Sequence, residues 1–300
     1  MITTLSAMQV SRIKTFIIGL ALVLLGPALT GCSALRLAYA NGSQLSWWWL
    51  DGYFDFSRQH SPQVRQALDD WFEWHRSTQL TGVTALLGAA GQQVMEPVSP
   101  ALVCRWQERI REQFEPAVGR ALTDFADAVP GLGDAQLKHL ERHYLKVNDD
   151  MRADYIQTDA AERQRESLKR ALERAERVYG RLDDNQSRLV AAGIGASPFN
   201  PELWLAERQR RQRDALQTLR RLVSERPDKD QHVAALRALV QRTEKSPNAE
   251  YRAYQVKLTE YNCGLAAQLH NATTPAQRAK ARDNLKGWET DLRSLLVPSA

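Results

Sequence analysis

The apolar residues of this chain recur at intervals of three and four over most of its length, which is the spacing of one face of an α-helix. Several of these segments open with a capping residue followed by proline, a pair that typically begins a helix: Ser61-Pro62, Ser99-Pro100, Asn200-Pro201, Ser246-Pro247 and Thr274-Pro275. After residue 32 we find no run of β-branched residues with the alternation of a strand. The pattern therefore predicts an all-α fold.

The helices expected from this pattern cover most of the chain after the N-terminal region. Their predicted ranges are 62–93, 100–128, 183–193, 201–224, 228–243, 247–270 and 275–296. The segment 134–180 is either one continuous amphipathic helix, about 70 Å long at 1.5 Å per residue, or two helices separated near Thr158-Asp159, where Asp159 and Glu162 would form a capping box. We expect the continuous helix. The sequence thus predicts an elongated multi-helix bundle with one long amphipathic helix.

The first 31 residues have the pattern of a cleaved signal peptide. Arg12 and Lys14 precede an apolar run from Phe16 to Leu29. This run is too short for a transmembrane helix, which needs about 20 residues. Translation begins at either Met1 or Met8, because a complete signal peptide follows both.

The end of this segment resembles the lipobox of bacterial lipoproteins. The residues that carry the resemblance are Leu29, Thr30, Gly31 and Cys32. The resemblance implies that Cys32 receives a diacylglyceryl group, that the chain is cut before it, and that its new amino group is acylated. Ser33 after the cysteine implies sorting to the outer membrane. The alternative is an ordinary secretory signal with a chance cysteine.

With this anchor, residues 1–31 are the signal peptide, 32–44 form the lipidated anchor and a short tether, and 45–300 form a single helical domain that faces the periplasm. The mature chain loses two of the 40 basic residues and none of the 35 acidic residues, which leaves a net charge of about +3. A nucleic-acid partner therefore has no support. The densest basic run, 208–213, either contacts an anionic group or forms a solvated helix face.

Two cysteines, Cys104 and Cys263, remain after lipidation of Cys32. Disulfides form readily in the oxidising periplasm, so these cysteines are a candidate pair. Two independent buried thiols are the alternative.

The segment 45–54, which contains three consecutive tryptophans, is either a belt at the membrane interface or part of the core, and we expect the core.

His139 and His143 lie one helical turn apart and form a candidate metal pair. The sequence supplies no obvious third ligand, so histidines that pack between helices or lie on the surface are the alternative. We find no nucleophile elbow, phosphate-binding glycine loop or dinucleotide fingerprint. We therefore predict no catalytic residue, no metal and no cofactor, and we expect a protein that is not an enzyme.

Three pentapeptides end in glutamine near a helix start: 132–136 (LGDAQ), 182–186 (LDDNQ) and 273–277 (TTPAQ). They are similar to the Leu-Thr-x-x-Gln motif of periplasmic helical chaperones, although none keeps both Leu and Thr. The same pattern also arises wherever an apolar residue precedes a helix cap. Both interpretations stay open at the level of the sequence.

Taken as a whole, the chain from Cys32 resembles an uncharacterised family of proteobacterial lipoproteins. The resemblance is carried by Cys32–Tyr39, Trp48–Tyr53, Trp74–Leu80 and Trp288–Leu292. It implies a helical periplasmic domain on a lipid anchor and brings no functional residues, because the family has no assigned activity.

From these observations we expect a non-enzymatic, chaperone-like or adaptor protein that contacts the membrane through its lipid and binds envelope proteins or unfolded polypeptide. The alternatives are a structural envelope tether and a metal-dependent envelope enzyme that uses His139 and His143. The sequence predicts no oligomeric state.

Overall fold

A computed structural model describes residues 34–296 of the chain. Its internal contacts divide the chain into two compact units, Met1–Asn41 and Gly42–Ala300, each of which is described by itself. In the first unit, the described residues form helix α2 (Ala34–Ala40). The predicted signal peptide and the lipobox lie outside the described residues. The division at Gly42 falls just before the predicted domain start at residue 45.

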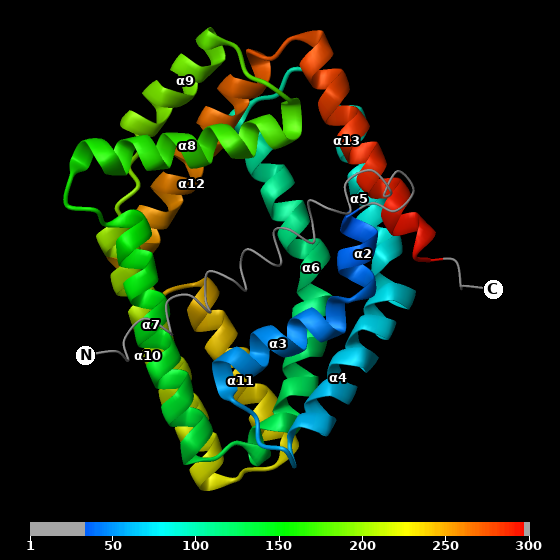
Figure 1. The fold of residues 1–300 in the computed structure, drawn as a ribbon, viewed down its shortest axis with the longest axis vertical. Helices are drawn as coiled ribbons and strands as arrows, with labels where there is room; N and C mark the ends of the chain where they lie inside the picture. Colours follow the sequence, from blue (N-terminus) through cyan, green and yellow to red (C-terminus); the bar gives the residue numbers. More distant parts are fainter. Residues whose placement is uncertain (1–33, 297–300) are drawn as a thin grey trace, which may run out of the picture. The chain divides into compact units, whose positions relative to one another are not determined.

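The described part of the second unit consists of helices joined by short loops (Figure 1). The α-helices are α3 (Gly42–Phe54), α4 (Ser61–Trp74), α5 (Leu80–Gln93), α6 (Pro100–Ala128), α7 (Asp134–Tyr155), α8 (Ala160–Tyr179), α9 (Asp184–Gly195), α10 (Pro201–Glu225), α11 (Lys229–Glu244), α12 (Ala249–Asn271) and α13 (Pro275–Ser294). A π-helical turn, η1 (His75–Gln79), joins α4 to α5, and a 3₁₀ turn, η2 (Val129–Gly131), follows α6. No strand occurs between residues 34 and 296, which confirms the all-α prediction.

Local capping explains where most of the helices begin. The side chains of Ser99, Asn200 and Thr274 each accept a hydrogen bond from a backbone N–H of the first turn, and a proline follows each of them as predicted. The other two predicted starts are shifted. Ser61 is already the first residue of α4, and α12 is capped by Asn248 instead of Ser246.

The prediction of one continuous helix over 134–180 is wrong. Helix α7 ends at Tyr155, and α8 begins at Ala160, after Asp159 accepts a hydrogen bond from the backbone N–H of Ala161. A short polar side chain such as aspartate competes with the helical backbone for hydrogen bonds and therefore favours a cap over a helix interior. The site near Thr158-Asp159 is the break that the sequence pattern left as the alternative.

The buried apolar side chains form two separate cores. The larger core joins α3, α4, the end of α6, α7, α10 and α11, and it includes Trp47, Val129, Leu140 and Leu219. The smaller core joins Leu182, Val190 and Leu269 with the apolar face of α8. Because neither core contains every helix, the fold is assembled from local groups of helices.

Three pairs of helices have the most extensive contacts. The pairs are α5 with α13, α6 with α12, and α7 with α10. Figure 1 shows α7 and α10 side by side, and the bonds of Glu141 to Arg220 and of Asn148 to Gln212 show that the two helices are antiparallel. None of the helices in residues 34–296 has the length and apolar character needed to cross a bilayer.

A disulfide joins Cys104 of α6 to Cys263 of α12, with a distance of 5.5 Å between the two Cα atoms. The two cysteines are 159 residues apart in the sequence. A crosslink that closes such a long loop restricts the unfolded chain strongly, and the chain-entropy model gives an upper limit of about 5 kcal/mol for its contribution. The disulfide thus fixes one helix pair by a covalent bond.

Removal of this bond tests its contribution to stability. We expect the double variant Cys104→Ala/Cys263→Ala to lower the free energy of unfolding by about 2–5 kcal/mol, because the unfolded chain regains its loop entropy. Urea denaturation followed by circular dichroism measures the change. A reductant should destabilise the wild-type protein by a similar amount and leave the double variant unaffected. Equal stability of the two proteins without reductant would contradict the expectation.

Candidate functional site

The predicted lipidation site lies outside the described residues. Leu29, Thr30, Gly31 and Cys32 precede residue 34, where the description begins. Lipidation of Cys32 therefore stays a prediction from the sequence.

His139 and His143 of α7 both contact α3. The Nε2 atom of His139 lies 3.1 Å from the carbonyl oxygen of Gly52, and the ring of His143 packs 4.1 Å from the ring centre of Tyr53. Burial lowers the pKa of His143, and the charge of His139 lowers it further. Among residues 34–296, no group of three or more His, Cys, Asp or Glu side chains is arranged to hold a metal ion. The pair lies at the packed interface of two helices, the role that the sequence left as the alternative.

The three motif glutamines bond to backbone groups at helix starts. Gln136, Gln186 and Gln277 each accept a hydrogen bond from the backbone N–H three residues earlier. Gln186 and Gln277 also bond to each other through both amide groups, at 2.7 and 2.8 Å. The side-chain nitrogen of each then donates to the loop before the other's helix, at Ala272 and Arg181 respectively. With Gln186 only 2% exposed, these residues hold helices together and do not face a ligand.

Two arginines of the dense basic run of α10, Arg210 and Arg211, are bound to a buried glutamate. Glu207, which is 4% exposed, accepts hydrogen bonds from Arg210 and Arg211 at 2.9 and 3.0 Å and from Ser246 at 3.1 Å. Burial would raise the pKa of Glu207, but these three hydrogen bonds hold the pKa below its usual range. The cluster fastens α10 to the segment before α12 and neutralises Arg210 and Arg211, whereas Arg213 of the same run is exposed.

A different region has the properties of a binding site. A groove with a volume of about 570 Å³ lies between the end of α7, α8, the segment after α9, the start of α10 and α12. Its charged and aromatic lining residues are Tyr155, Arg163, Arg170, Arg174, Phe199 and Trp204. The groove draws on segments that are more than 100 residues apart in the sequence, from Tyr155 to Asn262, and the fold brings them together.

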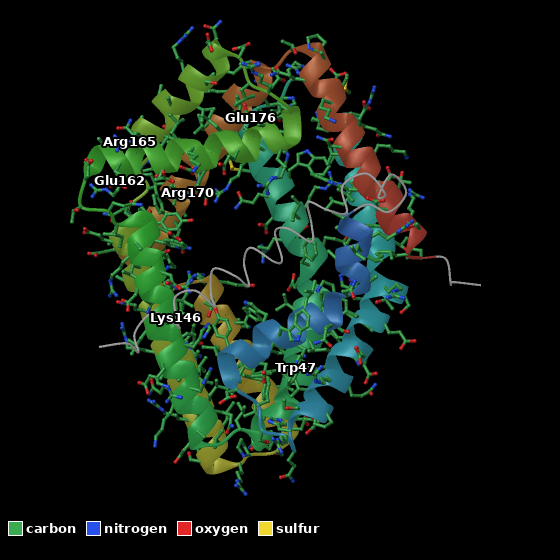
Figure 2. The ribbon with its side chains drawn as sticks, in the orientation of Figure 1. Trp47, Lys146, Glu162, Arg165, Arg170 and Glu176 are labelled. Carbon is green, nitrogen blue, oxygen red and sulfur yellow. A yellow bond between two sulfur atoms is a disulfide. The ribbon has the colours of Figure 1, made fainter. Side chains whose placement is uncertain are left out.

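The electrostatic character of the groove is strongly basic. Arg163, Arg170 and Arg174 lie on one side of α8 because seven and four residues separate them. Figure 2 shows Arg170 on the side of α8 that faces α7. No aspartate or glutamate is among the described residues that line this groove. The first residues of α8 and α10, Ala160 and Pro201, also line it, and helix N-termini carry partial positive charge.

Two of the arginines have structural bonds, whereas the third is available. Arg163 donates to the carbonyl oxygen of Gln157, and Arg170 donates to that of Asp154 at 3.2 Å. The guanidinium of Arg170 also lies 4.4 Å from the ring centre of Tyr155. Arg174 is exposed, and among the described residues no hydrogen bond or ion pair occupies it. A carboxylate in the groove would therefore find an unused planar donor at Arg174.

Three aromatic side chains that contact one another also line the groove. The ring of Trp204 lies 5.3 Å from that of Tyr155 and 6.0 Å from that of Phe199. Phe199 is 38% exposed, so this wall offers apolar surface to a ligand. An adjoining hollow of about 450 Å³ extends the groove, shares Arg163, Ser197, Phe199 and Pro201 with it, and is also lined by Glu202. The combined shape and chemistry suit an extended ligand that carries both carboxylates and apolar groups.

The sequence pattern alone does not reveal this groove. Its one signal was the polar run within 157–167, where the apolar pattern of the predicted long helix lapses. That run contains the turn between α7 and α8 and the first arginine of the groove. The aromatic wall comes from the distant segment 199–204 and has no pattern that connects it with α8.

Comparisons with known proteins identify a family without an assigned activity. A family model described as a family of unknown function (DUF6279) matches residues 52–252. Neither the search of curated proteins nor the search of solved structures gives a match.

The glutamine pair yields a testable expectation for stability. Gln186→Ala should lower the free energy of unfolding by about 2 kcal/mol, because it removes a buried side chain that bonds to Gln277 and to the carbonyl of Ala272. Thermal and urea denaturation measure the loss. Gln231→Ala is the matched control. Gln231 closes only the capping box of its own helix, α11, so its substitution should lower the free energy of unfolding by less. Equal losses for the two variants would show that the pair adds nothing.

Proposed function

We propose a function for this chain, which belongs to DUF6279, a family of unknown function whose model matches residues 52–252. In our proposal, the protein is a non-enzymatic binding protein that a lipid tethers to the cell envelope. In this proposal, the domain faces the periplasm and holds extended polypeptide segments in the groove between α8 and α10. The observation that carries the proposal is the lining of the groove by three arginines and three aromatic residues, with Glu202 as the one acidic residue of the adjoining hollow.

The tether is supported by the sequence around Cys32. A basic start, an apolar run and the lipobox residues Leu29, Thr30 and Gly31 stand in the order found in bacterial lipoproteins. Several acyl chains, each contributing about 0.8 kcal/mol per buried CH₂, would hold the protein firmly on a bilayer. The Cys104–Cys263 disulfide agrees with an oxidising compartment, where such bonds persist. By resemblance, Ser33 assigns the protein to the outer membrane.

The ligand class follows from the chemistry of the groove. Arginine presents a planar fork of donors that matches a carboxylate, so Arg174 suits an aspartate or glutamate side chain or a chain terminus. The rings of Phe199 and Trp204 suit apolar side chains beside that carboxylate. A polypeptide with alternating acidic and apolar residues offers both groups at short spacing. This chaperone-like or adaptor role needs neither a metal nor a cofactor.

Peptide binding tests the groove. We use the purified acylated protein in detergent, with a fluorescein-labelled peptide of alternating glutamate and leucine and a second peptide in which glutamine replaces glutamate. Fluorescence anisotropy should show tighter binding of the glutamate peptide. Arg174→Glu should weaken that binding by about tenfold, or roughly 1.4 kcal/mol, because it replaces the free donor with a repelling charge.

The matched control is Arg142→Glu, which makes the same charge change at an exposed position of α7 outside the groove. Its affinity for the glutamate peptide should equal that of the wild type. Equal affinity for both peptides would refute carboxylate recognition. Weakening by Arg142→Glu as strong as that by Arg174→Glu would refute the groove as the site. Failure of both peptides to bind, with crosslinking in cells to one envelope component, would favour a structural tether.

Metabolic labelling tests the lipid anchor independently. Cells that express the wild-type chain in the presence of radioactive palmitate should yield a labelled protein, because Cys32 is the acylation site. Cys32→Ala should abolish the label, whereas Cys104→Ala should keep it. Label that persists in the Cys32→Ala protein, or is absent from the wild type, would refute the anchor and leave the peptide-binding test unaffected.

A further inference from the structure

One face of helix α3 is buried in the domain, and another face is exposed. Trp47 and Phe54 are buried in the larger core, where Trp47 stacks on Phe56 with 5.5 Å between ring centres. Trp48 and Trp49, by contrast, are 61% and 62% exposed. The expectation that this aromatic segment belongs to the core is therefore confirmed for the first tryptophan of the triplet and wrong for the other two.

The exposed residues form one continuous patch. Leu45, Trp48 and Trp49 are three and four residues apart, which places them on the same side of the helix, and Leu45 is also exposed. The charged residue of α3, Asp51, accepts a hydrogen bond from the backbone N–H of Phe56 at 3.1 Å. We call Leu45, Trp48 and Trp49 the tryptophan face. It carries no charge.

The fold prevents this face from turning inward. Helix α3 contacts both α4 and α7 (Figure 1). The guanidinium of Arg65 from α4 lies 4.0 Å from the ring centre of Trp47, on the buried side. Tyr53 contacts His143 of α7. These buried side chains fix the rotation of α3 about its own axis. The tryptophan face therefore stays exposed unless something outside the described domain covers it.

The chemistry of the face suits a bilayer interface. Tryptophan concentrates at the depth of the lipid headgroups because its large apolar ring carries one N–H donor that stays near water. A cluster of two exposed tryptophans and a leucine is unusual for a surface that faces only water. The absence of charge on the face removes the main cost of insertion among the lipids.

The position of the face in the chain identifies the bilayer as its partner. Trp48 is 16 residues from Cys32, and a fully extended chain of that length spans at most about 55 Å. The actual reach is shorter because Ala34–Ala40 is helical, with a rise of about 1.5 Å per residue. A lipid on Cys32 would thus confine Trp48 to the neighbourhood of the bilayer surface at all times. A diffusing protein partner has no comparable constraint.

We propose that the tryptophan face inserts into the headgroup region of the membrane that holds Cys32, as a second attachment point beside the lipid. This inference rests on the proposed lipid anchor. A single acylated cysteine lets the domain rotate about its tether, whereas a second contact through α3 fixes which side of the domain faces the bilayer.

Fluorescence quenching by lipids tests the insertion. The full acylated protein is reconstituted into vesicles of phosphatidylethanolamine and phosphatidylglycerol, part of which carry bromine on the acyl chains near the headgroup. Bromine quenches tryptophans that lie within the bilayer. We expect quenching of the wild-type protein and its loss in Trp48→Ser/Trp49→Ser. The control Trp288→Ser, at a partly exposed tryptophan of α13, should keep the quenching.

Mass spectrometry of the N-terminal peptide and thermal unfolding accompany the measurement, so that acylation and folding of each variant are known. Acylated, vesicle-bound protein without quenching overturns the inference and leaves the anchor intact. Quenching that persists in the folded double variant also overturns it. Dimerisation that depends on Trp48 and Trp49, in place of quenching, would assign the face to a second copy of the chain. Absence of acyl chains overturns both the anchor and the inference.

Discussion

The backbone carbonyl groups at the end of α7 determine the arrangement of the chain that follows. The last four carbonyls of any helix have no partner within the helix and need donors from elsewhere. Arg170 of α8 donates to the carbonyl of Asp154 in the last turn of α7, and Arg163 donates to that of Gln157 in the turn that follows; together these bonds close the turn and set the direction in which α8 leaves. Helix α8 can then pack its apolar face on α9 to form the smaller core. Because the same arginines line the groove, the contacts that satisfy the turn also create its basic wall.

Local signals in the sequence predicted the fold class and many helix starts, whereas features that depend on distant contacts were not predicted. Ser99 and Thr274 cap their helices through hydrogen bonds within one turn, so the nearby residues carry the whole signal. The break after Tyr155 is different, since the polar residues there suit a solvated helix as well as a turn. The packing of α8 on α9 decides between these two, and no local pattern contains that information. The aromatic wall at Phe199 was missed for the same reason.

The arginines of this protein show that the density of charge is a poor guide to binding. In the densest run, in α10, Arg210 and Arg211 are paired with Glu207, so these two guanidinium groups offer little to a ligand. Arg174 stands among acidic and apolar residues in a sequence typical of a solvated helix, yet it faces a groove without a carboxylate. What matters is whether the fold has already supplied a partner. That property depends on side chains from other helices and so becomes visible in the three-dimensional structure alone.

The reciprocal bonds between Gln186 and Gln277 couple two helix starts that lie 91 residues apart. Each glutamine caps its own helix and also donates to the loop before the other, so the bonds of the two starts are reciprocal. Neither α9 nor α13 can unravel at its first turn without removing a partner from the other. The first turns of the two helices are therefore coupled, and we expect the backbone amides of these two turns to exchange with solvent together.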